Sequence, residues 1–275
     1  MPTNPTPTAL AQSPNGGFPA LPVAPGETAA AAGAAQAEAI IKARYAVAQR
    51  CPRSIDAVRD SLLRDCRRPR FAEVARWKRP VGGKQITGPS IRLAEAAVRA
   101  MGNVDVETPT VFDDDTRRIV RVSVTDLEAN TTYSLDITVA KTVERRDGDG
   151  REILGARENA SKQMVYIVCA TDDELMVKQA ALVSKAIRTC ALRLVPGDIL
   201  EEALETAATT LATADKADPE AGRKRLLDSF AAVGVSGAML GKFLGHDTTA
   251  LSPVELADLR AIYAAIRDGE ARWTD

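Results

Sequence analysis

Apolar residues recur at helical spacing in several stretches of the chain, and the longest of these is Thr171–Gly197. At about 100° per residue, one stripe of this predicted helix is apolar. The stripe consists of Met176, Ala180, Val183, Ile187, Cys190, Ala191 and Leu194. Thr171 and Glu174 have the spacing of a capping box, which predicts that the helix begins there. The other side carries Lys178, Lys185, Arg188 and Arg193, interrupted by Leu182 and Leu192. Such a face is commonly just solvated, but it also suits a helix that offers cations to a polyanion.

Between residues 103 and 143 the apolar period changes from helical to two, which indicates strands. Strands are predicted over Asn103–Phe112, Arg118–Thr125 and Thr132–Val143, with turns at Asp113–Asp115 and Glu128–Asn130. Such a sheet has one apolar face that needs a cover. The predicted fold class is therefore α+β. We expect a three-stranded antiparallel β-meander packed on the long central helix with flanking helices, followed by a small C-terminal all-α module.

Capping serines predict two further helices, Ile55–Cys66 after Ser54 and Ile91–Met101 after Ser90. The short apolar segment Gln163–Ala170 is interpreted as a helix. Composition divides the chain into four parts. These are a disordered Pro/Ala-rich tail over residues 1–38, a core over 39–211, a polar linker over 212–221 and a small helical module over 222–275. The last part of the tail, residues 28–39, also suits the start of a helix that runs on to residue 50.

Charge is segregated along the chain although the net charge is only −1. Residues 42–101 carry 15 Lys and Arg against 5 Asp and Glu, which predicts a local anion-binding surface. The four cysteines lack a CxxC spacing and the chain has one histidine, so a zinc site and a Ser-His-Asp triad are not expected. We expect no cofactor and no enzymatic activity. The chain has neither an apolar run near the roughly 18–20 residues of a membrane span nor a signal peptide, so a cytoplasmic protein is expected.

A basic segment with interleaved aromatic residues follows the Ile55–Cys66 helix. Pro80, Gly82 and Gly83 predict that its last third is an exposed loop, and GGKQ lacks the spacing of a phosphate-binding P-loop. Cations and rings in alternation suit single-stranded nucleic acid, with Trp77 as the stacking candidate, although a core tryptophan with a solvated rim is a serious alternative. The charged excursion over residues 141–162 is predicted to be a hairpin or mobile finger. The candidate DNA-binding residues are Arg67, Arg68, Arg70, Arg76, Trp77, Lys78, Arg79, Lys84, Lys141, Arg145, Arg146, Arg157, Lys162, Lys178, Lys185 and Arg188.

The order of these elements resembles that of phage single-strand DNA annealing proteins of the RecT/Redβ/Erf superfamily. The resemblance rests on Lys84–Val104, Val165–Ala203 and Leu256–Ala271, and it covers roughly residues 40–205 for the annealing core. It implies ATP-independent binding of single-stranded DNA and annealing of complementary strands to a duplex, by a ring or helical oligomer, in the bacterial host cytoplasm. In that class the C-terminal module often contacts a partner such as single-stranded-DNA-binding protein or an exonuclease, here through residues 222–275. The alternative is a structural or scaffold oligomer whose basic block pairs with acidic blocks of its neighbour.

Overall fold

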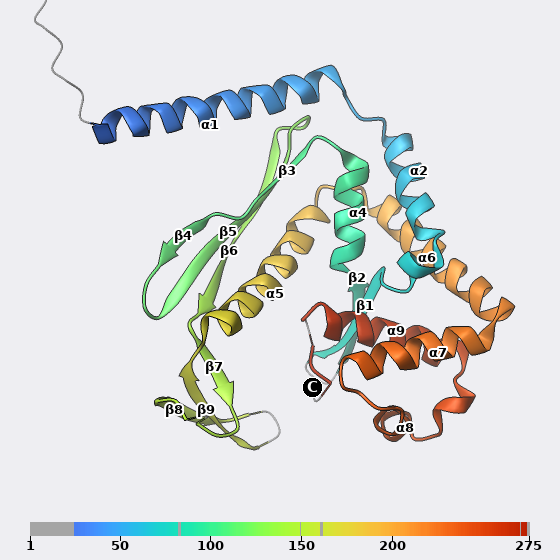
Figure 1. The fold of residues 1–275 in the computed structure, drawn as a ribbon. Coiled ribbons are helices and arrows are strands. Elements are labelled where there is room, and N and C mark those ends of the chain that lie inside the picture. Colours follow the sequence, from blue (N-terminus) through green and yellow to red (C-terminus); the bar gives the residue numbers. More distant parts are fainter. Residues whose placement is uncertain (1–24, 82–83, 149, 160–161, 270, 274–275) are drawn as a thin grey trace, which may run out of the picture. The chain divides into compact units, whose positions relative to one another are not determined.

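The computed structural model of the chain describes residues 25–81, 84–148, 150–159, 162–269 and 271–273, and Figure 1 shows the order of its elements. The predicted α+β class is confirmed, since 55% of the structure is helical and 22% is strand, with antiparallel sheets and C-terminal helices. The chain forms two compact units, residues 1–46 and 47–275, which are described separately. No single helix in the described ranges is long and apolar enough to cross a membrane.

The whole described part of the first unit belongs to helix α1, Pro25–Arg50, whose last residues belong to the second unit. Alanine dominates its first half, and alanine has the highest helix propensity, so the segment is helical without a strongly amphipathic pattern. Residues 25–38 therefore differ from the disordered tail predicted for residues 1–38, and the alternative of a helix running to residue 50 is confirmed. The predicted disorder of residues 1–24 lies outside the described residues.

Helices α2, Ile55–Cys66, and α4, Ile91–Met101, have the predicted bounds and caps. The Ser90 side chain accepts a hydrogen bond from the Leu93 N–H, and its hydroxyl donates to the Val74 carbonyl at 2.5 Å. The short helix α3, Pro69–Ala72, and the long helix α6, Gly197–Ala217, complete this layer. Their shared core is made by Leu62, Leu63, Leu93, Ala97, Ile199 and Ala203. Helix α6 runs through most of the predicted linker over residues 212–221, and only Asp218 separates it from the next helix.

The predicted basic loop is instead largely a β-hairpin of strands β1, Arg76–Val81, and β2, Lys84–Pro89. Pro80 lies inside β1, which a two-stranded hairpin tolerates because each strand has an unpaired edge. Residues 82–83 at the turn lie outside the described residues. Trp77 pairs with Gly88, and a Cβ added to Gly88 would lie 3.3 Å from Trp77 Nε1, so the indole lies over the glycine.

The main sheet contains strands β3, Val104–Glu107, β4, Thr110–Asp113, β5, Arg117–Asp126, and β6, Thr131–Ala140. Strands β3 and β4 pair with successive stretches of β5, so the predicted first strand is interrupted at Thr108-Pro109. Strand β6 also pairs with β5. Val120, Val122 and Val124 are buried on one face. The other face is polar and carries the cross-strand pairs Arg121–Asp136, Ser123–Ser134 and Thr125–Thr132.

A second antiparallel sheet, here called the finger sheet, follows directly. It contains β7, Thr142–Arg145, β8, Ile153–Glu158, and β9, Met164–Cys169, in the order β7–β9–β8. The helix predicted over Gln163–Ala170 is therefore wrong, because this apolar run is the central strand of the finger sheet. Short apolar runs suit strands and buried helical segments equally, and pairing on both edges decides between them here.

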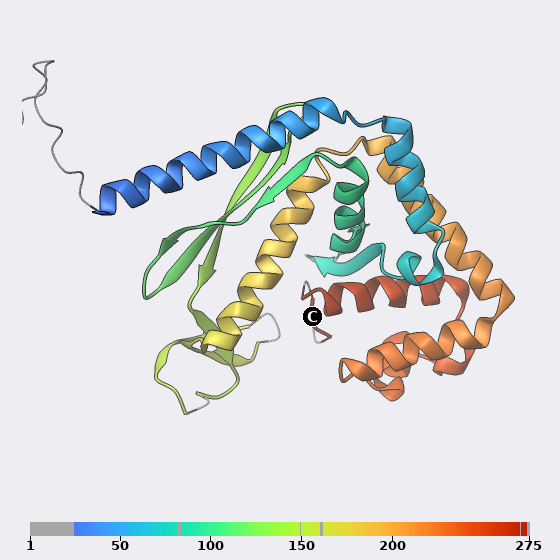
Figure 2. The ribbon, with the colours of Figure 1, turned by 45° about the horizontal axis from the view of Figure 1, so that its top comes forward.

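Helix α5, Asp172–Ala191, has the predicted capping box at Thr171 and Glu174. It contacts β5, β6 and α4, as the turned view in Figure 2 shows. Near its end Cys190 and Ala191 share a core with Val124 and Ala94, as the apolar stripe predicted. In the first turns of α5 the predicted apolar stripe is wrong, because Met176 is 68% exposed while Leu175 is buried in its place.

Helices α7, Pro219–Ala232, α8, Gly237–Leu244, and α9, Pro253–Arg267, with the 3-10 turn η1, Thr248–Ala250, form the C-terminal module. Phe230 is its central buried side chain, and it makes edge contacts with the rings of Tyr263 and Trp273. The module is not detached, since α9 contacts β1 and α6, and α7 contacts α6.

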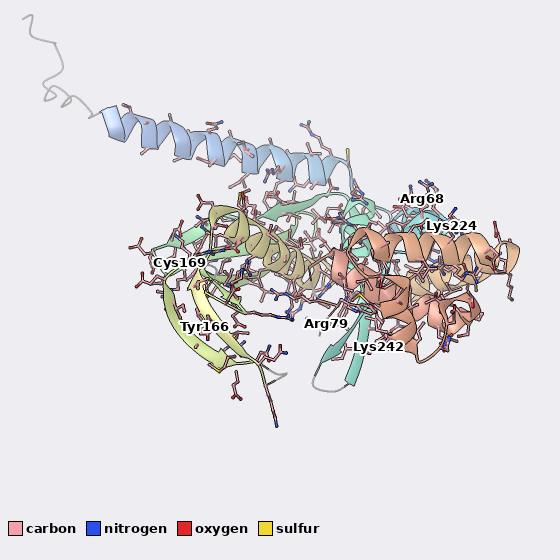
Figure 3. All side chains as sticks on the ribbon, turned by 60° about the horizontal axis from the view of Figure 1, so that its bottom comes forward. Arg68, Arg79, Tyr166, Cys169, Lys224 and Lys242 are labelled. Atoms are coloured by element: carbon pink, nitrogen blue, oxygen red, sulfur yellow. The ribbon has the colours of Figure 1, made fainter. Side chains whose placement is uncertain are left out.

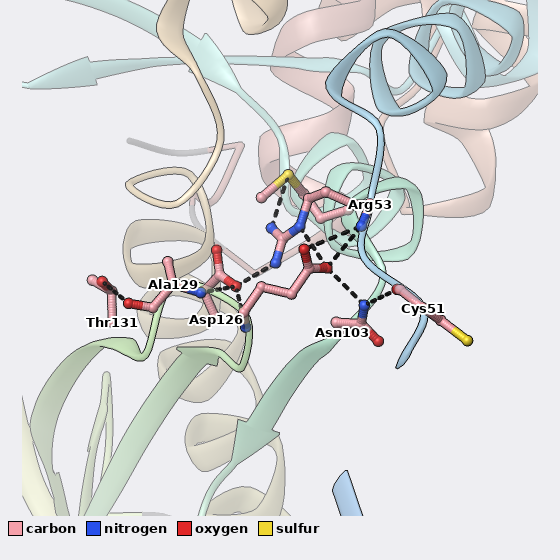
Figure 4. A network of polar contacts seen from close by, with 8 residues as sticks. Cys51, Arg53, Asn103, Asp126, Ala129 and Thr131 are labelled. Atoms are coloured by element: carbon pink, nitrogen blue, oxygen red, sulfur yellow. Dashed lines mark hydrogen bonds and ion pairs between the residues drawn. The ribbon is translucent and has the colours of Figure 1, made fainter. Parts of the chain in front are cut away.

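A polar network fixes the segment before α2 to the β5–β6 turn (Figure 4). Arg53 donates to Asp126 and Glu128, and Asn103 Nδ2 donates to Glu128 at 2.6 Å and to the Cys51 carbonyl at 2.7 Å. The hydrogen bond from Asn103 is the largest cause that lowers the pKa of the Glu128 carboxyl, and the hydrogen bonds from Arg53 lower it further. The α2–α4 layer and the main sheet are therefore joined by charge-assisted hydrogen bonds as well as by apolar contact.

Candidate nucleic-acid interface

Exposed guanidinium groups gather where α2 ends and α3 begins, at the side chains Arg64, Arg67, Arg68 and Arg70, here called the arginine corner. Arg68 bonds Asp65 at 2.8 Å and lies over the Phe71 ring at 5.6 Å; it is labelled in Figure 3. The other three make no ion pair with any residue that the structure describes. Arg64 was not among the predicted residues, although it lies in the last turn of a predicted helix, only three residues before Arg67.

Arg67 also borders an open groove of about 720 Å³ along α6. Two of the threonines in its wall donate their hydroxyl hydrogens within the helix, Thr210 to the Thr206 carbonyl and Thr213 to the Thr209 carbonyl. Glu202 and Glu205 lie in the same wall. The groove therefore has an arginine at its rim and carboxylates along its side. Because these carboxylates repel phosphates, a DNA backbone is not expected to follow the groove far.

Trp77 is buried, with 9% of its surface exposed, and it does not offer a free stacking face. The guanidinium carbons of Arg79 and Arg188 lie 5.3 Å and 4.9 Å from its ring centroid. Its Nε1 is buried without a hydrogen-bond acceptor among the described atoms. The alternative of a core tryptophan with a cationic rim therefore describes Trp77 in the structure, and the stacking role stays a prediction.

The neighbouring cations of the hairpin are also engaged. Lys78 Nζ lies 2.7 Å from Asp258 of α9, and Arg79 lies on Trp77. Arg76 is exposed at a pocket of about 220 Å³ that also contains Glu73 and Asp258. Lys84 begins β2, but its side chain lies outside the described residues. Of the predicted hairpin cations, Arg76 is therefore the one whose described contacts leave it accessible to a phosphate.

The basic face predicted for α5 is divided by the structure. Lys178 Nζ donates to the carbonyls of Ala140 and Thr142, both at 2.9 Å, and burial lowers its pKa. Arg188 is 6% exposed, and burial, followed by the nearby Arg79, lowers its pKa. Lys185 is exposed and makes no ion pair within the described part of the chain. Of the three predicted cations of this helix, Lys185 is thus the one open to solvent, because Arg188 is buried and the half-buried Lys178 is bonded to two carbonyls.

Glu174 is the charge centre of the junction between α5 and the finger sheet. Its carboxylate accepts hydrogen bonds from Arg145 and Arg151, the latter at 2.7 Å, and from the Thr171 N–H at 2.8 Å. These partners, Arg151 first, lower the pKa of Glu174 to about 2. The sequence identified Glu174 as a cap, but its second role depends on strands whose pairing the sequence does not specify.

The remaining predicted cations of the excursion are partly engaged as well. Arg157 forms an ion pair with Glu144 at 2.8 Å, and Lys141 forms one with Asp113 at 2.8 Å. Arg146 and Lys162 are exposed and have no ion pair among described residues. The finger sheet therefore offers two accessible cations rather than the five predicted.

An open groove of about 1180 Å³ lies between α5, the finger sheet and the C-terminal module. Its wall on α5 includes Val177, Lys178 and Leu182, and its wall on the module includes Ile266 and Trp273. Arg145 and Lys178 in this groove already have partners, so its charge is largely balanced internally. Among the described residues, no group of three or more His, Cys, Asp and Glu side chains is arranged to hold a metal ion.

Comparison of the chain with known protein families, with characterised proteins and with solved structures finds no match.

Proposed function

We propose that this protein binds single-stranded DNA and anneals complementary strands without ATP, as a ring or filament in phage recombination. In this proposal the main sheet and α5 form the annealing core over residues 39–211, and the C-terminal module recruits a partner. Its partners are single-stranded DNA, the annealed duplex and further copies of the chain. The protein acts in the bacterial host cytoplasm, as a binding protein rather than an enzyme.

The arginine corner carries this proposal. Acidic side chains engage many of the exposed arginines elsewhere, including Arg92, Arg121 and Arg157. Arg64, Arg67 and Arg70 lie within seven consecutive residues and have no carboxylate partner among the described residues. Exposed cations without counter-charges are the groups that bind phosphates and release condensed counter-ions. Phosphate contacts carry no sequence information, as a protein that anneals any complementary strands requires.

Binding of a fluorescent single-stranded oligonucleotide, followed by anisotropy over a range of salt concentrations, tests this. The double variant Arg67→Ala/Arg70→Ala is compared with Arg92→Ala/Arg121→Ala, which removes the same charge from exposed arginines that already have carboxylate partners. We expect the corner variant alone to weaken binding and to reduce the log–log salt slope by about 0.7 per lost phosphate contact.

Equal losses in both variants would show that net charge alone governs binding. Absence of binding by the unaltered protein, combined with salt-dependent self-association, would support the scaffold alternative. A companion assay mixes two complementary oligonucleotides without ATP and follows duplex formation, while electron microscopy looks for rings or filaments.

A further inference from the structure

The C-terminal module lies on the hairpin that carries several predicted DNA contacts. Helix α9 contacts β1, and Asp258 of α9 forms an ion pair with Lys78 at 2.7 Å. The Lys78 side chain is 20% exposed in this pair. A carboxylate of the module therefore occupies the position at which a DNA phosphate would meet this ammonium group.

The chain segment after α9 lies against α5. A Cβ added to Gly269 would lie 3.1 Å from the Cβ of Ala181, so the backbone there runs directly against the helix. Asp268, one residue earlier, accepts hydrogen bonds from Arg267 with both carboxylate oxygens, at 2.8 and 3.0 Å. Trp273 and Ile266 form the wall opposite Lys178 and Leu182 in the groove described above. The module thus contacts both elements whose cations the sequence assigned to DNA.

One buried ion pair holds the module at its other end. Arg260 of α9 donates to both carboxylate oxygens of Asp215 of α6, at 2.7 and 2.8 Å, and the two side chains are 5% and 10% exposed. Gly222 of α7 closes over this pair, since a Cβ there would lie 2.6 Å from Asp215 Oδ1. The connection to the core is a single non-helical residue, Asp218, between α6 and α7.

We propose that the C-terminal module is a self-inhibitory cover over Lys78 and the adjoining side of α5, held closed by the Arg260–Asp215 pair. This rests on the proposed DNA-binding function, whose first contact is the exposed arginine corner. Asp258 acts as an internal substitute for a phosphate. A protein whose competent state is a minor fraction binds its ligand more weakly by that fraction, so opening the cover raises the apparent affinity.

A charge-matched pair of variants tests the cover. The opener, Gly222→Ala/Asp258→Asn, pushes a methyl group against Asp215 and removes the carboxylate from Lys78. The control, Gly197→Ala/Asp228→Asn, makes the same chemical changes where the added Cβ meets nothing within 4 Å and where the aspartate is exposed without an ion pair to a described residue. Alanine favours the helix over glycine at both positions, so unfolding of α7 does not account for a difference.

Two readouts separate the cover from the DNA-binding function. The first is affinity for single-stranded DNA, expected to rise up to about tenfold in the opener alone if about a tenth of the unaltered protein is open. The second needs no DNA. It is the rate at which maleimide labels the thiol introduced by Ala181→Cys, in a background with the exposed Cys51 and Cys169 replaced by serine and the buried Cys66 and Cys190 retained.

Faster labelling and tighter binding in the opener support the proposal. Equal labelling rates in opener and control overturn the cover, whatever the DNA affinity. Faster labelling without tighter binding, in a protein that does bind DNA, shows that the module moves but does not inhibit, which also overturns it. Faster labelling in a protein that never binds single-stranded DNA leaves the cover without a ligand and refutes the proposed function itself.

Discussion

Arg188 places its guanidinium 4.9 Å from the centroid of the Trp77 ring, and both side chains are buried. The contact joins α5 to the hairpin β1–β2 by a cation–π interaction away from bulk water, where such contacts are strongest. Two residues that the sequence assigned to DNA are therefore part of the protein's own packing.

Replacing Trp77 with alanine tests this packing. We expect the free energy of unfolding to fall by about 3–5 kcal/mol, as for other buried aromatic side chains, and Trp77→Phe to cost less. Urea denaturation measures the change. Affinity for single-stranded DNA, measured per folded molecule, is expected to be kept. A Trp77→Ala protein of normal stability that has lost DNA binding would restore the stacking role.

Lys178 and Lys185 are expected to respond differently to alanine substitution, although they share one side of α5. Lys178→Ala leaves the carbonyls of Ala140 and Thr142 without their donor, so we expect a loss of stability of about 1–3 kcal/mol. Lys185→Ala is expected to leave stability unchanged and to weaken DNA binding about equally for all sequences, because the lysine is exposed. Thermal unfolding and anisotropy on two unrelated oligonucleotides measure both effects; the opposite assignment of effects would contradict the structure.

The buried Arg260–Asp215 pair is expected to matter far more to stability than an exposed pair. Asp215→Ala leaves a guanidinium buried without its carboxylate, at a cost of about 3–5 kcal/mol. Asp136→Ala, which breaks the exposed Arg121–Asp136 pair, serves as the control and is expected to cost about 0–1 kcal/mol. Denaturation midpoints in urea compare the two variants. Coinciding midpoints would mean that the C-terminal module is not anchored by this pair.

His246 and Glu255 predict a pH dependence of the module's stability. Nε2 of His246 lies 2.7 Å from Glu255 Oε1, which raises the pKa of His246 above its ordinary 6.5. The hydrogen bond with His246, which is the largest cause, and the hydrogen bonds from Ser252 lower the pKa of Glu255 from 4.5 to about 2. Because the histidine pKa is raised, its contribution is complete below pH 6.5 and is lost as the pH rises through the folded-state value. Because the glutamate pKa is lowered, its contribution is present above pH 4.5 and is lost as the pH falls towards 2.

The window of greatest stabilisation therefore lies between these two ordinary values. The His246→Gln variant is expected to have a lower melting temperature than the unaltered protein near pH 5.5. The difference in melting temperature is expected to be much smaller near pH 8, because His246 loses its charge as the pH rises. Melting temperatures at the two values, in buffers of equal ionic strength, measure the difference. A gap of the same size at both would show that the ring packs but does not titrate with its partner.

The features that the sequence predicted well are those decided within a few residues. Ser54, Ser90 and Thr171 cap their helices as expected, since a capping hydrogen bond needs only the next turn of chain. The alternation around Val120–Val124 predicted a strand with one buried face for the same reason. Local spacing is sufficient where the partner of a residue lies close to it in sequence.

The predictions that failed depend on partners far away in the chain. Lys78 meets Asp258 across 180 positions, and Trp77 meets Arg188 across more than a hundred. Nothing near Met176 indicates that its side of α5 is left uncovered while Lys178 turns inward to two carbonyls. The sequence around a basic side chain therefore does not show whether that side chain is solvated, paired or buried, and only the tertiary packing distinguishes these three cases.

Glu174 and Lys178 have a mechanical consequence. They lie one helical turn apart and are bonded, respectively, to arginines of the finger sheet and to carbonyls at the bend between the two sheets. These bonds connect both the finger sheet and the bend to the first turns of α5. We therefore expect a displacement of the finger sheet to move the beginning of α5 with it.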